Sequence, residues 1–139
     1  MLDWSKATKY SGILQLYRNL IELRRNKQKN TRGLMGQNIR VFHTNDQTKV
    51  IAYHRWMEGG PGDDVIVVAN FSTQSFDSYT IGFPNSGTWE LRFNSDWKGY
   101  CEDFTNKGYS TTAHEGECDG LPCQGNVGLG PYSLIILSQ

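Results

Sequence analysis

The apolar positions of the chain change their spacing near residue 36, from the period of a helix to the period of a strand. Residues 12–25 place apolar side chains on one half of a helical wheel and polar side chains on the other. The apolar half consists of Ile13, Leu14, Leu16, Tyr17, Leu20, Ile21 and Leu23. This arc covers about 180°, which is wider than one packing surface requires. We therefore expect an amphipathic helix, capped by Ser11, that contacts two different surfaces, with Trp4 as a further docking residue.

The strongest strand signal is the run Val65–Ala69, which is continuously apolar and rich in β-branched residues. Both faces of such a strand are apolar, so we expect a central strand that is covered on both sides. Other segments alternate apolar and polar residues and end at Gly, Pro, Asn or Asp. They predict strands over residues 39–43, 50–56, 78–83, 88–93 and 132–137, and shorter ones over 109–113 and 126–129.

These six to eight strands, with turn signals between them, are typical of an antiparallel β-sandwich. The sequence therefore predicts a mainly β protein: a Greek-key-like antiparallel β-sandwich preceded by one N-terminal amphipathic α-helix. We place a boundary between residues 1–36, the helix and a linker, and residues 37–139, the sandwich.

A long stretch between Asn94 and Gly130 is rich in Gly, Asn, Asp and Thr, and it carries several aromatic residues. Trp97, Tyr100 and Phe104 are harder to explain as core residues than aromatic residues on strands. Aromatic faces stack on flat apolar surfaces, including those of sugars, so these three are candidate sugar-binding residues. The alternative is that their rings close one end of the sandwich.

Three aromatic residues fall on predicted strands, and we expect them in the core: Trp56, Trp89 and Tyr132.

Charge and hydropathy exclude several partner classes. The chain has 14 basic and 14 acidic residues, which argues against a nucleic-acid partner because such affinity depends on clustered Lys and Arg. It contains neither a membrane-spanning apolar stretch nor a signal-peptide pattern. Met1 directly precedes a motif that looks internal, so we expect an added start codon on an excised, monomeric domain.

The three cysteines, Cys101, Cys118 and Cys123, are too few and too irregular for a disulfide framework. Free thiols in a reducing compartment are the expected state, which indicates a cytoplasmic protein. A local bridge between Cys118 and Cys123 is the alternative. His114 with these two thiols is only weak evidence for zinc, so we expect no metal and no cofactor.

We find no arrangement of residues that supports catalysis. The chain lacks a nucleophile elbow, a phosphate-binding loop and a His-Glu-x-x-His helix. His43 and His54 fall on predicted strands, where a surface or hydrogen-bonded role is expected. The acidic pairs Asp63-Asp64 and Glu102-Asp103 sit in predicted turns, and we interpret them as solvated. No residue is therefore assigned a catalytic role.

Four segments resemble the α-amylase superfamily, glycoside hydrolase family 13, in the order in which that family carries them. Leu2-Asp3-Trp4 together with residues 16–25 resembles the last helix of the catalytic barrel. Val65–Ser72 is similar to the core strand of the all-β domain that follows the barrel. Thr88–Asp96 resembles that domain's segment of Trp, Leu and Asn-Ser/Thr-Asp, and Gly130–Ser133 resembles its closing turn. Among family members, the 1,4-α-glucan branching enzymes look most similar.

This resemblance implies a non-catalytic C-terminal accessory domain of an α-amylase or branching enzyme. The family carries its catalytic Asp, Glu and Asp on barrel loops that are outside this sequence. The family's C-terminal domain packs on the barrel of the same chain, stabilises it and sometimes contacts α-glucan. The sequence departs from the family pattern between Tyr100 and Gln124. Two alternatives remain: a carbohydrate-binding module that uses Trp97 and Tyr100, and a protein–protein interaction domain that docks through its helix.

Overall fold

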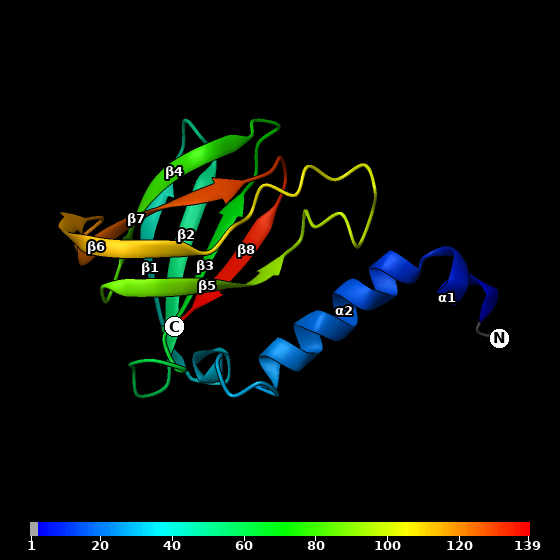
Figure 1. Cartoon of the computed structure of the whole chain (residues 1–139), viewed down its shortest axis with the longest axis horizontal. Helices are drawn as coiled ribbons and strands as arrows, with labels where there is room; N and C mark the ends of the chain where they lie inside the picture. The colour runs from blue at the N-terminus through cyan, green and yellow to red at the C-terminus, as the bar shows by residue number, and fades with distance from the viewer. Residues whose placement is uncertain (1–2) are drawn as a thin grey trace.

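The computed structural model describes residues 3–139, and it shows a β-sandwich with a helix along one side (Figure 1). Met1 and Leu2, and with them the expected start codon and the first residue of the Leu2-Asp3-Trp4 motif, lie outside the described residues. The elements are α1 (Ser5–Lys9), α2 (Ser11–Arg24), the 3-10 turn η1 (Arg32–Leu34), β1 (Asn38–Asn45), β2 (Val50–Trp56), β3 (Val65–Asn70), β4 (Phe76–Phe83), β5 (Gly87–Asn94), β6 (Thr111–Cys118), β7 (Leu121–Leu129) and β8 (Leu134–Ser138). No helix within the described part of the chain is long and apolar enough to cross a membrane.

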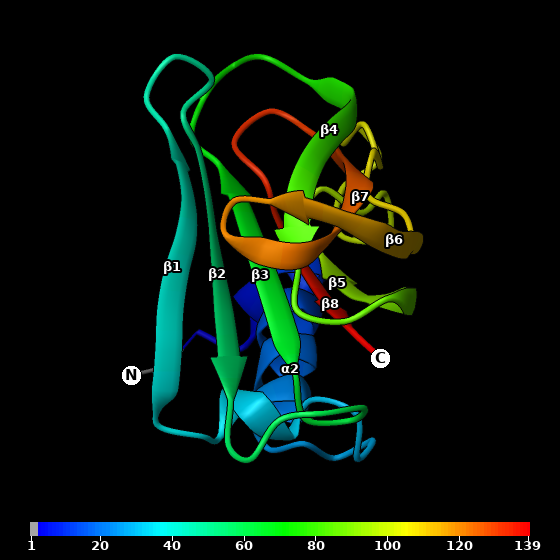
Figure 2. The same ribbon diagram turned by 90° about the vertical axis from the view of Figure 1, so that its left-hand side faces the viewer.

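The eight strands form one antiparallel sheet in the order β1-β2-β3-β8-β5-β6-β7-β4. Figure 2 shows the sheet folded over itself, with β4, β6 and β7 in front of β3 and β8, and α2 behind them. The fold turns at β5, because residues 87–89 pair with β6 and residues 90–94 pair with β8. Strands β4 to β7 have the spatial order of a Greek key. The predicted mainly β, antiparallel sandwich is confirmed.

Apolar side chains gather in two clusters, one on each face of the layer formed by β2, β3 and β8. The inner core lies between the two layers and contains Val50, Ala52, Ile66, Val68, Ile81, Phe83, Trp89, Ala113, Cys123, Val127, Leu129, Ile135 and Leu137. The outer core lies under α2 and contains Leu34, Val65, Val67, Phe93 and Ile136. Strand β3 supplies both clusters and is buried along its whole length, which confirms the predicted central strand.

Several details of the strands differ from the prediction. Trp89 is fully buried as expected and Trp56 is half-buried, but Tyr132 precedes β8 and is 70% exposed. A bulge between Leu91 and Phe93 reverses the alternation of β5, so Leu91 packs on the inner core and Phe93 enters the outer core. The long predicted loop is shorter than expected, because β6 and β7 occupy much of it.

Helix α2 packs on the sandwich with only part of its apolar surface. Leu16, Leu20 and Leu23 contact the outer core. The remaining apolar residues, which we call the outer stripe, are exposed: Ile13, Leu14, Tyr17 and Ile21. Tyr10, not Ser11, is the N-cap residue, and it makes no side-chain cap hydrogen bond. The prediction of Ser11 as the cap is wrong because the preceding turn α1 already brings Tyr10 into position.

The segment between α2 and β1 is built into the sandwich. Thr31 is fully buried, and its hydroxyl donates to the carbonyl of Leu23 at 2.8 Å. The N–H of Gly33 donates to the carbonyl of Asp63 at 2.9 Å. A side chain at Gly33 would overlap the backbone of this neighbouring loop, so only glycine permits this close approach. The predicted boundary at residue 36 stays a prediction.

Candidate functional site

The loop that carries the candidate sugar-binding residues is anchored at its base by Asp96. Its carboxylate is 6% exposed and accepts the N–H of Thr105 at 3.0 Å and the N–H of Lys107 at 3.3 Å. The hydroxyl of Thr105 also donates to it. In addition, the side chain of Asn94 accepts the N–H of Asp96 at 3.0 Å. The Asn-Ser-Asp ending of the sequence motif therefore closes this loop, which is a structural role.

The structure places Trp97 and Phe104 at two different hollows, and Tyr100 lines both. Trp97, 45% exposed, lines a hollow of about 230 Å³ together with Tyr100. Phe104, 36% exposed, lines a different hollow of about 410 Å³, beside the start of α2. The rings of Trp97 and Tyr100 meet edge to face, with centroids 5.0 Å apart and planes at 88°. The three rings therefore do not form one flat platform.

Tyr100 connects the loop to the helix. Its ring lies 6.0 Å from that of Phe93 in the outer core, and its hydroxyl accepts a hydrogen bond from the side chain of Asn19 at 2.6 Å. Burial raises the pKa of Tyr100, and the hydrogen bond from Asn19 opposes this change. The backbone of Tyr100 lies so close to Gly12 that a Cβ there would overlap it. Tyr100 therefore holds α2 against the sandwich, and Trp97 has the most exposed ring of the three candidates.

Two of the segments that resemble family 13, Val65–Ser72 and Gly130–Ser133, meet at one end of the sandwich, which the sequence alone did not reveal. The buried side chain of Asn70 donates to the carbonyl of Gly130 at 2.7 Å and accepts from the hydroxyl of Ser72 at 2.8 Å. The N–H of Tyr132 donates to the carbonyl of Ser72 at 3.0 Å. The hydroxyl of Ser133 donates to the carbonyl of Gly130 at 2.8 Å. These bonds join the turn after β3 to the turn before β8.

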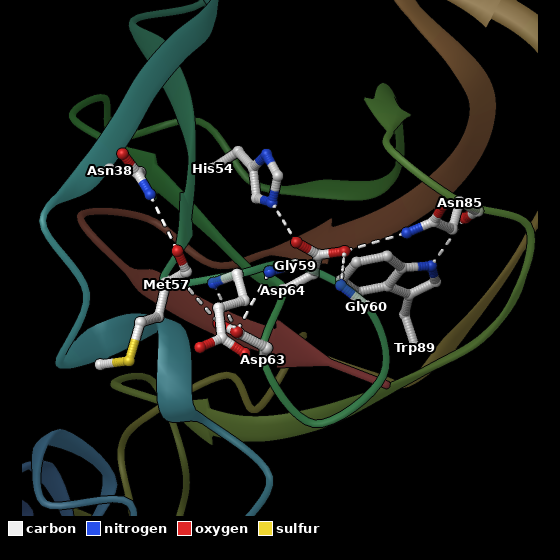
Figure 3. A network of polar contacts seen from close by, with 10 residues as sticks. Asn38, His54, Met57, Gly59, Gly60, Asp63, Asp64, Asn85 and Trp89 are labelled. Carbon is white, nitrogen blue, oxygen red and sulfur yellow. Dashed lines mark hydrogen bonds and ion pairs between the residues drawn. The ribbon is translucent and has the colours of Figure 1, made fainter.

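The opposite end of β3 carries a buried acidic pair, shown in Figure 3. Asp63 and Asp64 are each 4% exposed, so their prediction as solvated residues is wrong. The carboxylate of Asp63 accepts the N–H groups of Met57, Glu58 and Gly59 at 2.8, 2.8 and 3.1 Å. These bonds organise the turn between β2 and β3.

Burial opposes the charge of Asp63, but the three N–H groups and the nearby Arg32 outweigh it and hold the pKa of Asp63 below its ordinary value. The carboxylate of Asp64 lies 2.8 Å from Nε2 of His54 and accepts from the side chain of Asn85 at 2.9 Å (Figure 3). Each carboxylate oxygen of Asp63 and Asp64 thus has a hydrogen-bond partner within the fold. The pair therefore organises a turn and has no free oxygen to offer a substrate. Glu102 and Asp103 are exposed, as predicted.

The remaining polar candidates also have structural partners. Nδ1 of His43 lies 2.9 Å from the carboxylate of Asp119, and Nε2 lies 2.9 Å from the hydroxyl of Tyr79. This contact joins β1 to β4 and to the turn between β6 and β7. His43 and His54 are therefore hydrogen-bonded, as predicted.

The three cysteines are free thiols, of which Cys101 is exposed and Cys123 is buried. Within residues 3–139, no group of three or more His, Cys, Asp or Glu side chains is placed to hold a metal ion.

Comparison with known proteins identifies the domain. A family model described as "Alpha amylase, C-terminal all-beta domain" matches residues 42–139, which is more than half of the chain. The chain belongs to this family. The α-amylase C-terminal all-β domain family was expected from the motif at β3, the Asn-Ser-Asp segment and the turn before β8. The first and the last of these motifs are joined by the hydrogen bonds of Asn70 and Ser72.

Curated relatives of this α-amylase C-terminal domain include 1,4-alpha-glucan branching enzymes. The enzyme GlgB of Dechloromonas aromatica (strain RCB) is 29% identical over 148 aligned residues, which cover 99% of this chain and 22% of that protein. GlgB of Pseudomonas fluorescens (strain Pf0-1) is 32% identical over 88 residues, covering 63% of this chain and 12% of that protein. The chain thus spans about a fifth or less of the length of these relatives.

A solved α-amylase from H.orenii shares the fold of this α-amylase C-terminal domain. The match has a TM-score of 0.50 at 21% sequence identity and covers 91% of this chain and 20% of that chain.

Proposed function

We propose that the chain is the non-catalytic C-terminal accessory domain of an α-glucan-active enzyme of the α-amylase or branching type, within glycoside hydrolase family 13. In this proposal, residues 1–36 are the last helix of a catalytic barrel with its linker, and residues 37–139 form the accessory domain. The domain packs on that barrel, stabilises it and works in the cytoplasm. The family match begins at residue 42, so α2 lies outside the all-β domain, which supports the assignment of α2 to a preceding barrel.

The observation that carries this proposal is the division of the apolar surface of α2. Leu16, Leu20 and Leu23 suffice to pack the helix on the sandwich. The outer stripe nevertheless exposes 57% of Ile13, 61% of Tyr17 and 55% of Ile21. At 100° per residue, the outer stripe lies beside the packed one on the same helix. A second apolar surface next to the first is what a helix between two packed bodies requires.

The surroundings of Ile21 also fit a docking surface. A hollow of about 520 Å³ is lined by Ile21 and by charged side chains, among them Arg18, Glu22 and Arg25. These charged side chains border the apolar outer stripe on one side, and an apolar centre with a polar rim is the usual composition of a protein interface. The barrel of the same enzyme is the occupant that we assign to this surface.

The test compares this 139-residue chain with the longer enzyme. Ile21→Asp should leave the melting temperature of the short chain unchanged, because Ile21 is exposed there. In the longer enzyme the same change should lower the melting temperature, because it places a charge in an apolar interface. Gln15→Asp puts the same charge on the polar side of α2 and serves as the control. Equal melting temperatures for the longer enzyme and its Ile21→Asp variant would contradict the proposal.

An interaction domain for an unrelated protein is the competing assignment for the same surface. This assignment would lose its main support if Leu16, Leu20 and Tyr17 were all fully buried, but Tyr17 is 61% exposed. We favour the barrel because α2 precedes the region that matches the accessory-domain family.

A second candidate function is contact with α-glucan at Trp97. Its exposed ring borders a hollow with amide side chains from Asn19 and Asn106, and an aromatic ring with a few polar groups is typical of sugar-sized sites. Titration of this chain with maltoheptaose should then shift the backbone amide signals of residues 97–106, and Trp97→Ala should abolish these shifts. Saturable shifts that survive Trp97→Ala would exclude this site.

A further inference from the structure

Two exposed aromatic residues occupy the end of the sandwich where the segments Val65–Ser72 and Gly130–Ser133 meet. Phe71 is 66% exposed and Tyr132 is 70% exposed. Within residues 3–139, Trp4 is the only large apolar side chain with a greater exposed fraction. The turns that carry the two rings follow β3 and precede β8, at the upper end of these strands in Figure 1. They are directly joined by the hydrogen bond from the N–H of Tyr132 to the carbonyl of Ser72.

The backbone under both rings is held firmly. Asn70 is 2% exposed, and its side chain bonds both turns. The N–H of Phe71 donates to the carbonyl of Lys49 at 2.8 Å. Exposed aromatic rings on a firmly held backbone lose little conformational entropy when a ligand covers them.

The backbone conformation of Tyr132 is unfavourable for a residue with a side chain. Its φ of 47° lies in the left-handed region, where glycine and asparagine are tolerated at lower cost than tyrosine. The ring of Tyr132 is mostly exposed and belongs to neither core cluster. Packing of the fold therefore does not explain a tyrosine at this position, and an unexplained backbone outlier is a reasonable starting point for a functional hypothesis.

The surroundings of Phe71 indicate the chemistry of the ligand. Phe71 borders a hollow of about 330 Å³ that is also lined by the polar residues Thr44, Asn45, Asp46 and Lys49 and by the apolar residues Val50 and Ile51. The ammonium of Lys49 lies 2.6 Å from the carboxylate of Asp46. The two charges compensate each other, so the hollow offers polar groups without net charge. This combination suits a neutral ligand that is rich in hydroxyl groups and has an apolar face.

We propose that Phe71 and Tyr132 form a binding surface for α-glucan at this end of the sandwich, separate from the hollow at Trp97. The inference rests on the proposed link of the domain to α-glucan. One ring stacks on each of two sugar residues, while Asp46 and Lys49 hydrogen-bond the hydroxyl groups of the chain. The surface lies at the end of β3 opposite Asp63 and Gly33, where the segment after α2 joins the sandwich.

The experiment is a titration of the 139-residue chain with maltoheptaose, followed by backbone amide NMR, for the wild type and three variants. Phe71→Ser removes one ring, and Tyr132→Asn removes the other while suiting the left-handed backbone. Tyr17→Ala removes a ring of similar exposure, 61%, from α2 and is the control. We expect shifts at residues 45–49, 70–74 and 130–133. Phe71→Ser and Tyr132→Asn should each weaken binding about tenfold, and Tyr17→Ala should leave it unchanged.

Thermal unfolding separates binding from a structural role. If the Tyr132 ring serves only binding, Tyr132→Asn does not lower the melting temperature, because asparagine relieves the backbone conformation. A lower melting temperature with unchanged affinity would overturn the proposal. Sugar-induced shifts confined to residues 97–106 would also overturn it, while leaving the contact at Trp97 and the accessory role intact. Absence of sugar-induced shifts would likewise overturn it. Self-association that Phe71→Ser abolishes would then show that the surface joins copies of the chain.

Discussion

Substitution of Asp63 by asparagine tests how the buried turn between β2 and β3 is stabilised. One carboxylate oxygen accepts the N–H of Met57, and the other accepts the N–H groups of Glu58 and Gly59. Asparagine has the same shape but only one acceptor oxygen. In either orientation of the amide, at least one of the three N–H groups faces an NH₂ group instead of an oxygen.

The magnitude follows from the lost hydrogen bonds. A hydrogen bond to a charged acceptor contributes about 1.5–3 kcal/mol, and Asp63 is 4% exposed, so water replaces the lost acceptor poorly. Asp63→Asn loses one or two of the three bonds and weakens those that remain by removing the charge. We expect the free energy of unfolding to fall by about 2–4 kcal/mol at pH 7.

The effect should depend on pH with a defined sign. The pKa of Asp63 in the folded protein lies below its ordinary value of 3.8. A carboxylate of this kind stabilises the fold fully above its unfolded pKa and loses that contribution as the pH falls through its folded pKa. The difference in unfolding free energy between wild type and Asp63→Asn should therefore be constant near neutral pH and narrow below pH 3.8.

Urea unfolding followed by tryptophan fluorescence, repeated between neutral and acidic pH, measures both quantities. Asp77→Asn is a suitable control, since the side chain of Asp77 is 85% exposed and pairs with Lys107 at the surface. Such surface pairs contribute about 0–1 kcal/mol. A loss below about 0.5 kcal/mol for Asp63→Asn would refute the reasoning. A difference that widens in acid would refute the sign of the pKa change.

Three further predictions concern the core, the contact between α2 and Tyr100, and the thiols. Val67→Asp should abolish the cooperative thermal transition, because an unpaired buried charge costs several kcal/mol and the total stability of a domain is roughly 5–15 kcal/mol. An unchanged transition would show that the assignment of Val67 to the core is wrong. Gly12→Ala should lower the free energy of unfolding by about 1–3 kcal/mol and speed amide hydrogen exchange in α2, because a Cβ at this position overlaps the backbone of Tyr100. Slower exchange would mean that the higher helix propensity of alanine outweighs the overlap. Burial and the adjacent carboxylate raise the pKa of Cys118, so iodoacetamide at pH 8 should modify it at least about fivefold more slowly than the exposed Cys101, as peptide mass spectrometry would measure.

The main helix, most of the strands and the family could be predicted from the sequence, because the patterns that mark them involve residues close together in the chain. The continuous apolar run at β3 and the alternation in β2 depend on residues close together in the chain. The helical period of residues 12–25 is local in the same way. The motif residues Asn70 and Asp96 marked the family although their partners were unknown. Short-range bonds accompany both: the side chain of Asn70 accepts the N–H of Ser72, and the N–H of Asp96 donates to the side chain of Asn94. The same residues also reach distant backbone, Asn70 at Gly130 and Asp96 at Thr105, and only the short-range part of this pattern is visible in the sequence.

Tertiary structure alone decided which surfaces are buried and which groups meet. Asp63 looks like a solvated turn residue in the sequence, yet the fold surrounds it with three backbone donors. Phe93 follows the same alternation as Leu91, but a bulge in β5 turns it toward the outer core. The packed residues of α2 and its outer stripe are both apolar, and they differ in whether they face the outer core. Burial is a property of neighbours that are distant in the chain, so periodicity predicts that a face is apolar but not what covers it.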